Sequence, residues 1–158
     1  MVTITHLELT DPSRLRPAAD PGDTRVERVR DPDLSARLYR EVGGPWSWTD
    51  RLSWDAQAWD AWTRRVHTDV LYAGEVLAGY YELDPQPPHD VEIAIFGLLA
   101  AFHGRGLGGH LLTEAVRRAF ALPGTRRVWV HTCTLDGPHA LANYRARGFE
   151  PFKVEEQA

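Results

Sequence analysis

Apolar side chains alternate with polar ones in some segments of the chain and recur every three or four residues in others. Alternating and β-rich runs predict strands over residues 2–9, 68–74, 75–83, 91–100, 126–135 and 149–157. Helical spacing predicts helices over residues 31–44, 54–65, 110–122 and 137–148. Residues 10–24 are rich in Pro, Asp and Gly and predict a loop.

Local signals set several of these boundaries. Ser53 can cap the second helix, and Pro123 with Gly124 ends the third one. Residues 73–75 join two β-rich runs and predict an antiparallel hairpin. The later strand, glycine-rich loop, helix and strand have the form of a right-handed βαβ crossover. The predicted fold class is therefore mixed α/β, or α+β, with a mixed sheet and helices on both of its faces.

Composition narrows the class of protein. The 158 residues fit one domain, which we expect to span residues 1–158. The net charge of −4 and the scattered arginines argue against a nucleic-acid partner. The lone cysteine, Cys133, excludes an internal disulfide and a cysteine-rich zinc site, and no metal is expected. The sequence has no signal peptide and no apolar run of about 18 residues, so we expect a cytoplasmic protein without a membrane partner.

One stretch, "FHGRGLGGHLL" at residues 102–112, holds four glycines between a predicted strand and a predicted helix. Such a loop suits a phosphate, because glycines allow close approach and a helix N-terminus offers free N–H groups. The alternative is a tight turn with no ligand. The run satisfies G-x-G-x-x-G, but residues 125–131 lack the acid that a dinucleotide-binding fold requires. Residues 108–110 also lack the Lys and Ser/Thr of a Walker loop, so both standard nucleotide motifs fail.

Two motifs about 40 residues apart account for the glycines in another way. Residues 103–108 are similar to the Arg/Gln-x-x-Gly-x-Gly/Ala motif of the GNAT superfamily of acyl-coenzyme A-dependent N-acyltransferases. His103 replaces the usual Arg or Gln at a position that contributes mainly a backbone amide. Gly137 stands where an asparagine often starts the helix of the family's second motif. That second motif corresponds to Ala140, Tyr144, Gly148 and Phe149, and the resemblance covers about residues 71–149.

The resemblance implies a sheet geometry and a cosubstrate. The sheet would be mostly antiparallel, and the strand over 91–100 would splay away from the strand over 126–135, with a thioester between them. The glycine loop would hold the pyrophosphate of acetyl-coenzyme A, and the strand before it would hold the pantetheine arm. The residues implied in coenzyme binding are Gly97, Leu98, Leu99, His103, Gly104, Arg105, Gly106, Leu107, Gly108 and Gly109.

Acyl transfer to an amine requires a base for the amine, a donor for the oxyanion and an acid for the leaving thiolate. Glu92 is the candidate base, with a solvent-facing strand position as the alternative. His131 on the neighbouring strand is the reserve candidate, and its alternative is a hydrogen-bonded sheet histidine. The resemblance makes Tyr144 the candidate acid, against a half-buried aromatic whose hydroxyl is satisfied. A backbone N–H at Gly97 or Leu98 would be the oxyanion donor.

Five of the six tryptophans lie between positions 46 and 62, where the family places its acceptor site. Trp46 and Trp48 are the predicted acceptor wall, with packing as the alternative, because aromatic faces suit an amine cation. Arg51 would add polar reach, and His131 would lie on the acceptor side. Core packing is the prediction for Trp54, Trp59 and Trp62.

These observations together predict an N-acetyltransferase. It would transfer an acetyl group from acetyl-coenzyme A to a primary amine of a small molecule or peptide, by direct attack in a ternary complex. The alternative is a non-catalytic acyl-coenzyme A-binding or sensor domain, and an NAD-linked enzyme is a weaker third. The expected partner is a small-molecule amine, and the sequence leaves both a monomer and a homodimer open.

Overall fold

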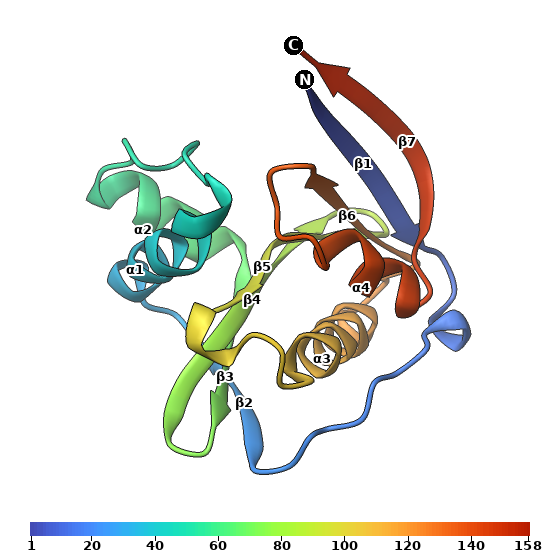
Figure 1. Ribbon diagram of the computed structural model, residues 1–158, viewed down its shortest axis with the longest axis horizontal. Helices are drawn as coiled ribbons and strands as arrows, with labels where there is room; N and C mark the ends of the chain where they lie inside the picture. The colour runs from blue at the N-terminus through green and yellow to red at the C-terminus, as the bar shows by residue number, and fades with distance from the viewer.

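A computed structural model describes residues 1–158 of the chain (Figure 1). The strands are β1 (Val2–Leu9), β2 (Thr24–Val29), β3 (His67–Ala73), β4 (Val76–Gln86), β5 (Asp90–Leu98), β6 (Arg127–Cys133) and β7 (Glu150–Gln157). The α-helices are α1 (Pro32–Gly43), α2 (Ala56–Arg65), α3 (Leu107–Ala121) and α4 (Ala140–Ala146). Short 3₁₀ turns lie at η1 (Pro12–Arg14), η2 (Gly44–Trp46) and η3 (Ala100–Phe102).

The seven strands form one sheet in the order β2-β3-β4-β5-β6-β1-β7. Every neighbouring pair is antiparallel except β5 and β6, which are parallel and joined by the crossover through α3. This topology confirms the mixed, mostly antiparallel sheet. It also confirms the hairpin at residues 73–75, because β3 and β4 pair across that turn.

Helices cover both faces of the sheet, as predicted. Val70 and Tyr80 pack with side chains of α1 on one face. Their chain neighbours, Leu71 and Tyr81, point the opposite way and join the larger core beneath α3. Alternate residues of a strand point to opposite faces, so the central strands are buried on both sides and form the rigid base of the molecule. No helix in the structure is both long and apolar enough to cross a membrane.

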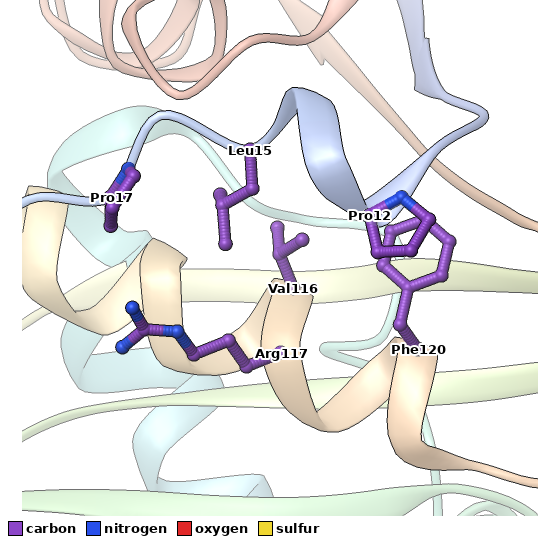
Figure 2. Close-up of a pocket in the computed structure, with 6 residues that line it drawn as sticks. All are labelled: Pro12, Leu15, Pro17, Val116, Arg117 and Phe120. Carbon is purple, nitrogen blue, oxygen red and sulfur yellow. The ribbon is translucent and has the colours of Figure 1, made fainter.

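The first strand completes the sheet far from its sequence neighbours. β1 lies between β6 and β7 and pairs with both, and Figure 1 shows its start beside the end of β7. The connection from β1 to β2 then passes over α3, where the backbone N–H of Ala18 donates to Thr113 Oγ1 at 2.9 Å. An open cavity of about 330 Å³ lies under this connection, away from every predicted site residue (Figure 2). Its lining residues are Pro12, Leu15, Pro17, Val116, Arg117 and Phe120.

The sequence analysis missed strand β2. Residues 24–29 follow the predicted loop and read Thr-Arg-Val-Glu-Arg-Val, a short run with three charged side chains. The strand lies at the edge of the sheet and pairs with β3 alone. Charged side chains are common on edge strands because they discourage pairing with other chains. The tertiary contact with β3, rather than local propensity, therefore defines this element.

Two helix starts also differ from the predictions. Ser53 does not cap α2, because the side chain of Asp55 accepts from the backbone N–H of Ala58 at 2.9 Å. Helix α3 begins at Leu107, three residues before the predicted start at His110. Gly106, with a φ of 77°, supplies the turn into the helix, so the last two glycines of the run belong to its first turn.

Candidate functional site

The site begins where β5 and β6 part. Their parallel ladder contains three register pairs and ends at Glu92 and Trp129. Strand β5 continues to Leu98 with β4 as its partner. A β-bulge at Ala94 interrupts the β4–β5 ladder just after the parting, and bulges redirect a strand in this way next to active sites. The predicted splay is therefore present, and the backbone of residues 93–98 has no ladder partner on the β6 side.

The glycine loop closes one end of this opening. Gly104 and Gly106 have φ values of 75° and 77°, a conformation that other residues adopt only with strain. Gly106 precedes α3 without any side-chain cap, so the first-turn N–H groups of the helix stay free for an anion. Asn143 of α4 donates from Nδ2 to the carbonyl of Gly108 at 3.1 Å. Arg105 is part of this loop, and its guanidinium carbon lies 5.1 Å from the Phe102 ring centre.

Glu92 and His131 meet at the point where the strands part. His131 Nδ1 lies 3.3 Å from Glu92 Oε2, with side-chain exposures of 50% and 14%. The other carboxylate oxygen accepts from Gln86 Nε2 at 3.1 Å. Gln86 Oε1 in turn accepts from the indole N–H of Trp129 at 2.9 Å. The structure thus joins the two predicted bases and fixes Glu92 from a second side that sequence reasoning missed.

Several carboxylates act on His131. Its hydrogen bond to Glu92 raises the pKa of the imidazole, and the charges of Glu92, Asp136 and Asp50 raise it further against the effect of burial. The imidazole therefore keeps its proton to a higher pH than an ordinary histidine does. The surroundings of His131 are therefore acidic and favour positive charge.

Tyr144 approaches the opening from α4. Its ring packs edge-on against Phe96, on the free part of β5, with centroids 6.0 Å apart. Phe149 contacts its other side at 6.0 Å, and only 6% of the residue is exposed. Burial, with a smaller effect from the charge of Asp136, raises the pKa of the phenol. The hydroxyl stays protonated at neutral pH and can serve as a proton donor.

Trp46 and Trp48 reach across the opening from the connection between α1 and α2. The Trp46 ring stacks on His103, with centroids 5.8 Å apart and an interplanar angle of 28°. Trp48 donates from Nε1 to Asp136 Oδ1 at 3.3 Å. Asp136 also accepts the backbone N–H of Cys133 at 3.1 Å. The sequence analysis did not single out this aspartate, although an acid just after a strand is typical of turns.

Arg51, predicted to add polar reach to the acceptor wall, lies inside the aromatic cluster, and 14% of its side chain is exposed. Its guanidinium carbon lies 4.0 Å from the Trp62 ring centre and 4.7 Å from that of Trp54. Its Nη1 is 3.9 Å from Oε1 of the buried Glu82, another residue that the sequence analysis missed. Burial lowers the pKa of Arg51 and outweighs the opposing charge of Glu82. The aromatic cluster around it confirms packing for Trp54, Trp59 and Trp62.

The carboxylate of Glu82 anchors this aromatic cluster through hydrogen bonds. Its Oε1 accepts from Trp62 Nε1 at 2.8 Å. Its Oε2 accepts from Thr68 Oγ1 at 2.9 Å and from Ser35 Oγ at 3.0 Å. Three neutral donors therefore stabilise a carboxylate that is 1% exposed, as a buried charge requires.

Comparison with known proteins gives the same protein family as the fold and the sequence motifs. The sequence profile of the acetyltransferase (GNAT) family matches residues 33–149. The N-alpha-acetyltransferase RimI of Mycobacterium tuberculosis is 32% identical over 132 residues, covering 80% of this chain and 75% of the relative. A mycothiol acetyltransferase of Corynebacterium glutamicum (strain R) is 32% identical over 111 residues, covering 70% of this chain but 36% of the relative.

A solved structure shows the same fold. The Bacillus subtilis acetyltransferase in complex with CoA superimposes with a TM-score of 0.63 at 24% identity, covering 80% of this chain and 76% of that one. Several other structures with this fold are about twice as long as this chain, which also spans only about a third of the mycothiol acetyltransferase. The family profile covers well over half of the chain and agrees with the splayed strands and the glycine loop. The chain therefore belongs to the GNAT acetyltransferase family.

Proposed function

We propose that this protein transfers an acetyl group from acetyl-coenzyme A to a primary amine. The observation that carries the proposal is the early parting of β5 and β6. It leaves an opening with a helix N-terminus at one end and a carboxylate–imidazole pair at the other. An opening of this form suits a ligand that has a phosphate at one end and a reactive carbonyl at the other.

The coenzyme would lie along β5. Its pyrophosphate would accept from the backbone N–H groups of residues 104–109, where glycine permits close approach. Its pantetheine arm would lie along the backbone of residues 96–99, where β6 is no longer paired, as a further strand would. This placement brings the thioester beside the parting of the strands, with Glu92 and Tyr144 on its two sides.

The chemistry is a direct acyl transfer. The amine nitrogen forms a bond to the thioester carbonyl carbon, and the carbon–sulfur bond breaks as the tetrahedral intermediate collapses. The proton lost by the amine goes to Glu92, or to His131 above its raised pKa. A backbone N–H of Gly97 or Leu98 stabilises the oxyanion, and Tyr144 donates its proton to the leaving thiolate.

The acceptor is a primary amine on a small molecule or a peptide. Free amines are cationic at neutral pH, and the acidic surroundings of His131 favour such a group. The relatives include an N-alpha-acetyltransferase and a mycothiol acetyltransferase. We therefore expect the acceptor site to lie on the sheet face where His131 is half exposed.

An amine screen tests the proposal. Purified protein is given acetyl-coenzyme A with a library of small amines and peptides, and thiol release is recorded. We expect release that depends on the acceptor and falls sharply in Glu92→Gln and Tyr144→Phe. Both variants should keep wild-type affinity for acetyl-coenzyme A by calorimetry. Binding without release for every amine would favour a non-catalytic acyl-coenzyme A-binding protein instead.

A further inference from the structure

Two departures from the family's motifs meet at one side chain. His103 and Gly137 replace the residues that the family commonly has, and they lie on different loops. The Trp46 ring stacks on His103, and a Cβ atom placed on Gly137 would lie 3.1 Å from Trp46 Cζ2. Any side chain at position 137 would therefore press on the indole. The absence of a side chain there makes room for Trp46.

A second indole continues along the same line. A Cβ atom placed on Gly97 would lie 3.6 Å from Trp48 Cη2. Trp48 also donates to Asp136, so it spans from β5 to the loop that follows β6. One ring thus lies beside Gly97, in the part of β5 that has no partner on the β6 side, and the other lies beside His103, after the end of that strand. Figure 1 shows the α1–α2 connection facing the loop between β6 and α4.

We propose that Trp46 and Trp48 cover the channel of the pantetheine arm. The inference rests on the proposed function, which places that arm along the same residues of β5. It assigns the two tryptophans to the coenzyme rather than to the acceptor wall. Indole rings lying along a chain of methylene and amide groups bury its apolar surface and keep water from the thioester.

The cover should affect the binding of ligands that have a pantetheine arm and leave the binding of other ligands unchanged. Acetyl-coenzyme A has the arm and needs the cover, whereas adenosine 3′,5′-bisphosphate has no arm and would contact only the region of the glycine loop. Damage to the glycine loop would weaken both ligands. Loss of the cover should weaken only the first.

Surface plasmon resonance on the immobilised protein provides the test. We expect Trp46→Ala to raise the dissociation rate constant of acetyl-coenzyme A about tenfold, the size of one lost aromatic contact. Gly137→Ala, whose added Cβ would press on the indole at 3.1 Å and shift it slightly, should change it in the same direction. Phe152→Ala is the matched control, because it removes an aromatic ring that is 44% exposed on β7. It should leave the constant unchanged, and no variant should alter the affinity for adenosine 3′,5′-bisphosphate.

The other outcomes overturn either the cover alone or the proposed function as well. An unchanged dissociation rate of acetyl-coenzyme A in both Trp46→Ala and Gly137→Ala overturns the cover and leaves the proposed function standing. Equal weakening of both ligands also overturns it, because the substitution then acts on the glycine loop. If the wild-type protein binds no acetyl-coenzyme A, the proposed function fails and the cover fails with it.

Discussion

Replacing Glu82 with alanine tests the buried polar network beneath the aromatic cluster. The carboxylate is 1% exposed and accepts from Trp62, Ser35 and Thr68. Alanine would leave these three donors without an acceptor and would remove the anion nearest to Arg51, at 3.9 Å. A stranded buried donor costs about 1–3 kcal/mol, and breaking a buried charged contact costs about 3–5 kcal/mol.

Relaxation of the structure and entry of water will reduce the combined cost of the stranded donors and the lost charged contact. We therefore expect Glu82→Ala to lower the free energy of unfolding by about 3–5 kcal/mol. Urea denaturation followed by tryptophan fluorescence measures the change. With a slope of about 2 kcal/mol per molar urea, the midpoint should fall by roughly 2 M. Glu82→Gln keeps one carbonyl acceptor for Trp62, so it should cost roughly 1–2 kcal/mol.

The control and the refutation are both direct. Glu75 lies in the turn between β3 and β4 with a side chain that is 93% exposed, so Glu75→Ala should change stability by no more than about 0.5 kcal/mol. If Glu82→Ala lowers the free energy of unfolding by less than about 1 kcal/mol with an unchanged urea slope, water molecules have replaced the carboxylate as acceptors for the three donors. The reasoning from a dry network of hydrogen bonds around Glu82 would then be wrong.

Three further outcomes follow from the site. Tyr144→Phe should lower kcat about 100-fold in steady-state kinetics, because an acid is lost, while the Kd for acetyl-coenzyme A stays within about twofold; an unchanged kcat would remove its role. Gly106→Asp should raise the Kd for acetyl-coenzyme A by about 100-fold or more, because a carboxylate would face the pyrophosphate. Its circular dichroism spectrum should be unchanged. Unchanged binding would contradict the placement of the pyrophosphate on the glycine loop. In Glu92→Gln, NMR titration should show a lower pKa for His131, because its main stabilising partner is gone. In the wild-type protein the folded pKa of His131 lies above the unfolded value of about 6.5. The contact between protonated His131 and Glu92 therefore stabilises the fold fully below pH 6.5, and this stabilisation is lost as pH rises through the folded pKa. An equal loss of stability in Glu92→Gln would refute the pairing.

Local patterns predicted the elements that form the opening. The β-rich run before the glycines, the glycine-rich loop after it and the hairpin at 73–75 all depend on nearest neighbours. Chain order alone also placed Glu92 and His131 on neighbouring strands, and the structure brings them to 3.3 Å. The placement succeeded because a parallel crossover restricts which strands can be adjacent.

The parts that sequence reasoning missed depend on distant contacts. Strand β2 forms by pairing with β3, and the bulge at Ala94 exists only in relation to β4. Gln86 and Asp136 have ordinary turn-like surroundings in the sequence, and their importance comes from Glu92 and Trp48, which lie on other elements. No local pattern encodes such partners, because the hydrogen bonds join segments that only the fold brings together.

The position of β1 has a consequence for the way the chain reaches its native state. Thr3 donates its backbone N–H to the side-chain hydroxyl of Thr134, 131 residues further along the chain. Strand β1 also pairs with β6, the strand that carries His131. Loops this long close late in folding, because their entropy is lost before the contacts form. During synthesis, β1 must wait on the order of 10 s for its partners to leave the ribosome. The half of the sheet that carries His131 therefore assembles late, because β1 can pair only after strands more than 100 residues further along have formed.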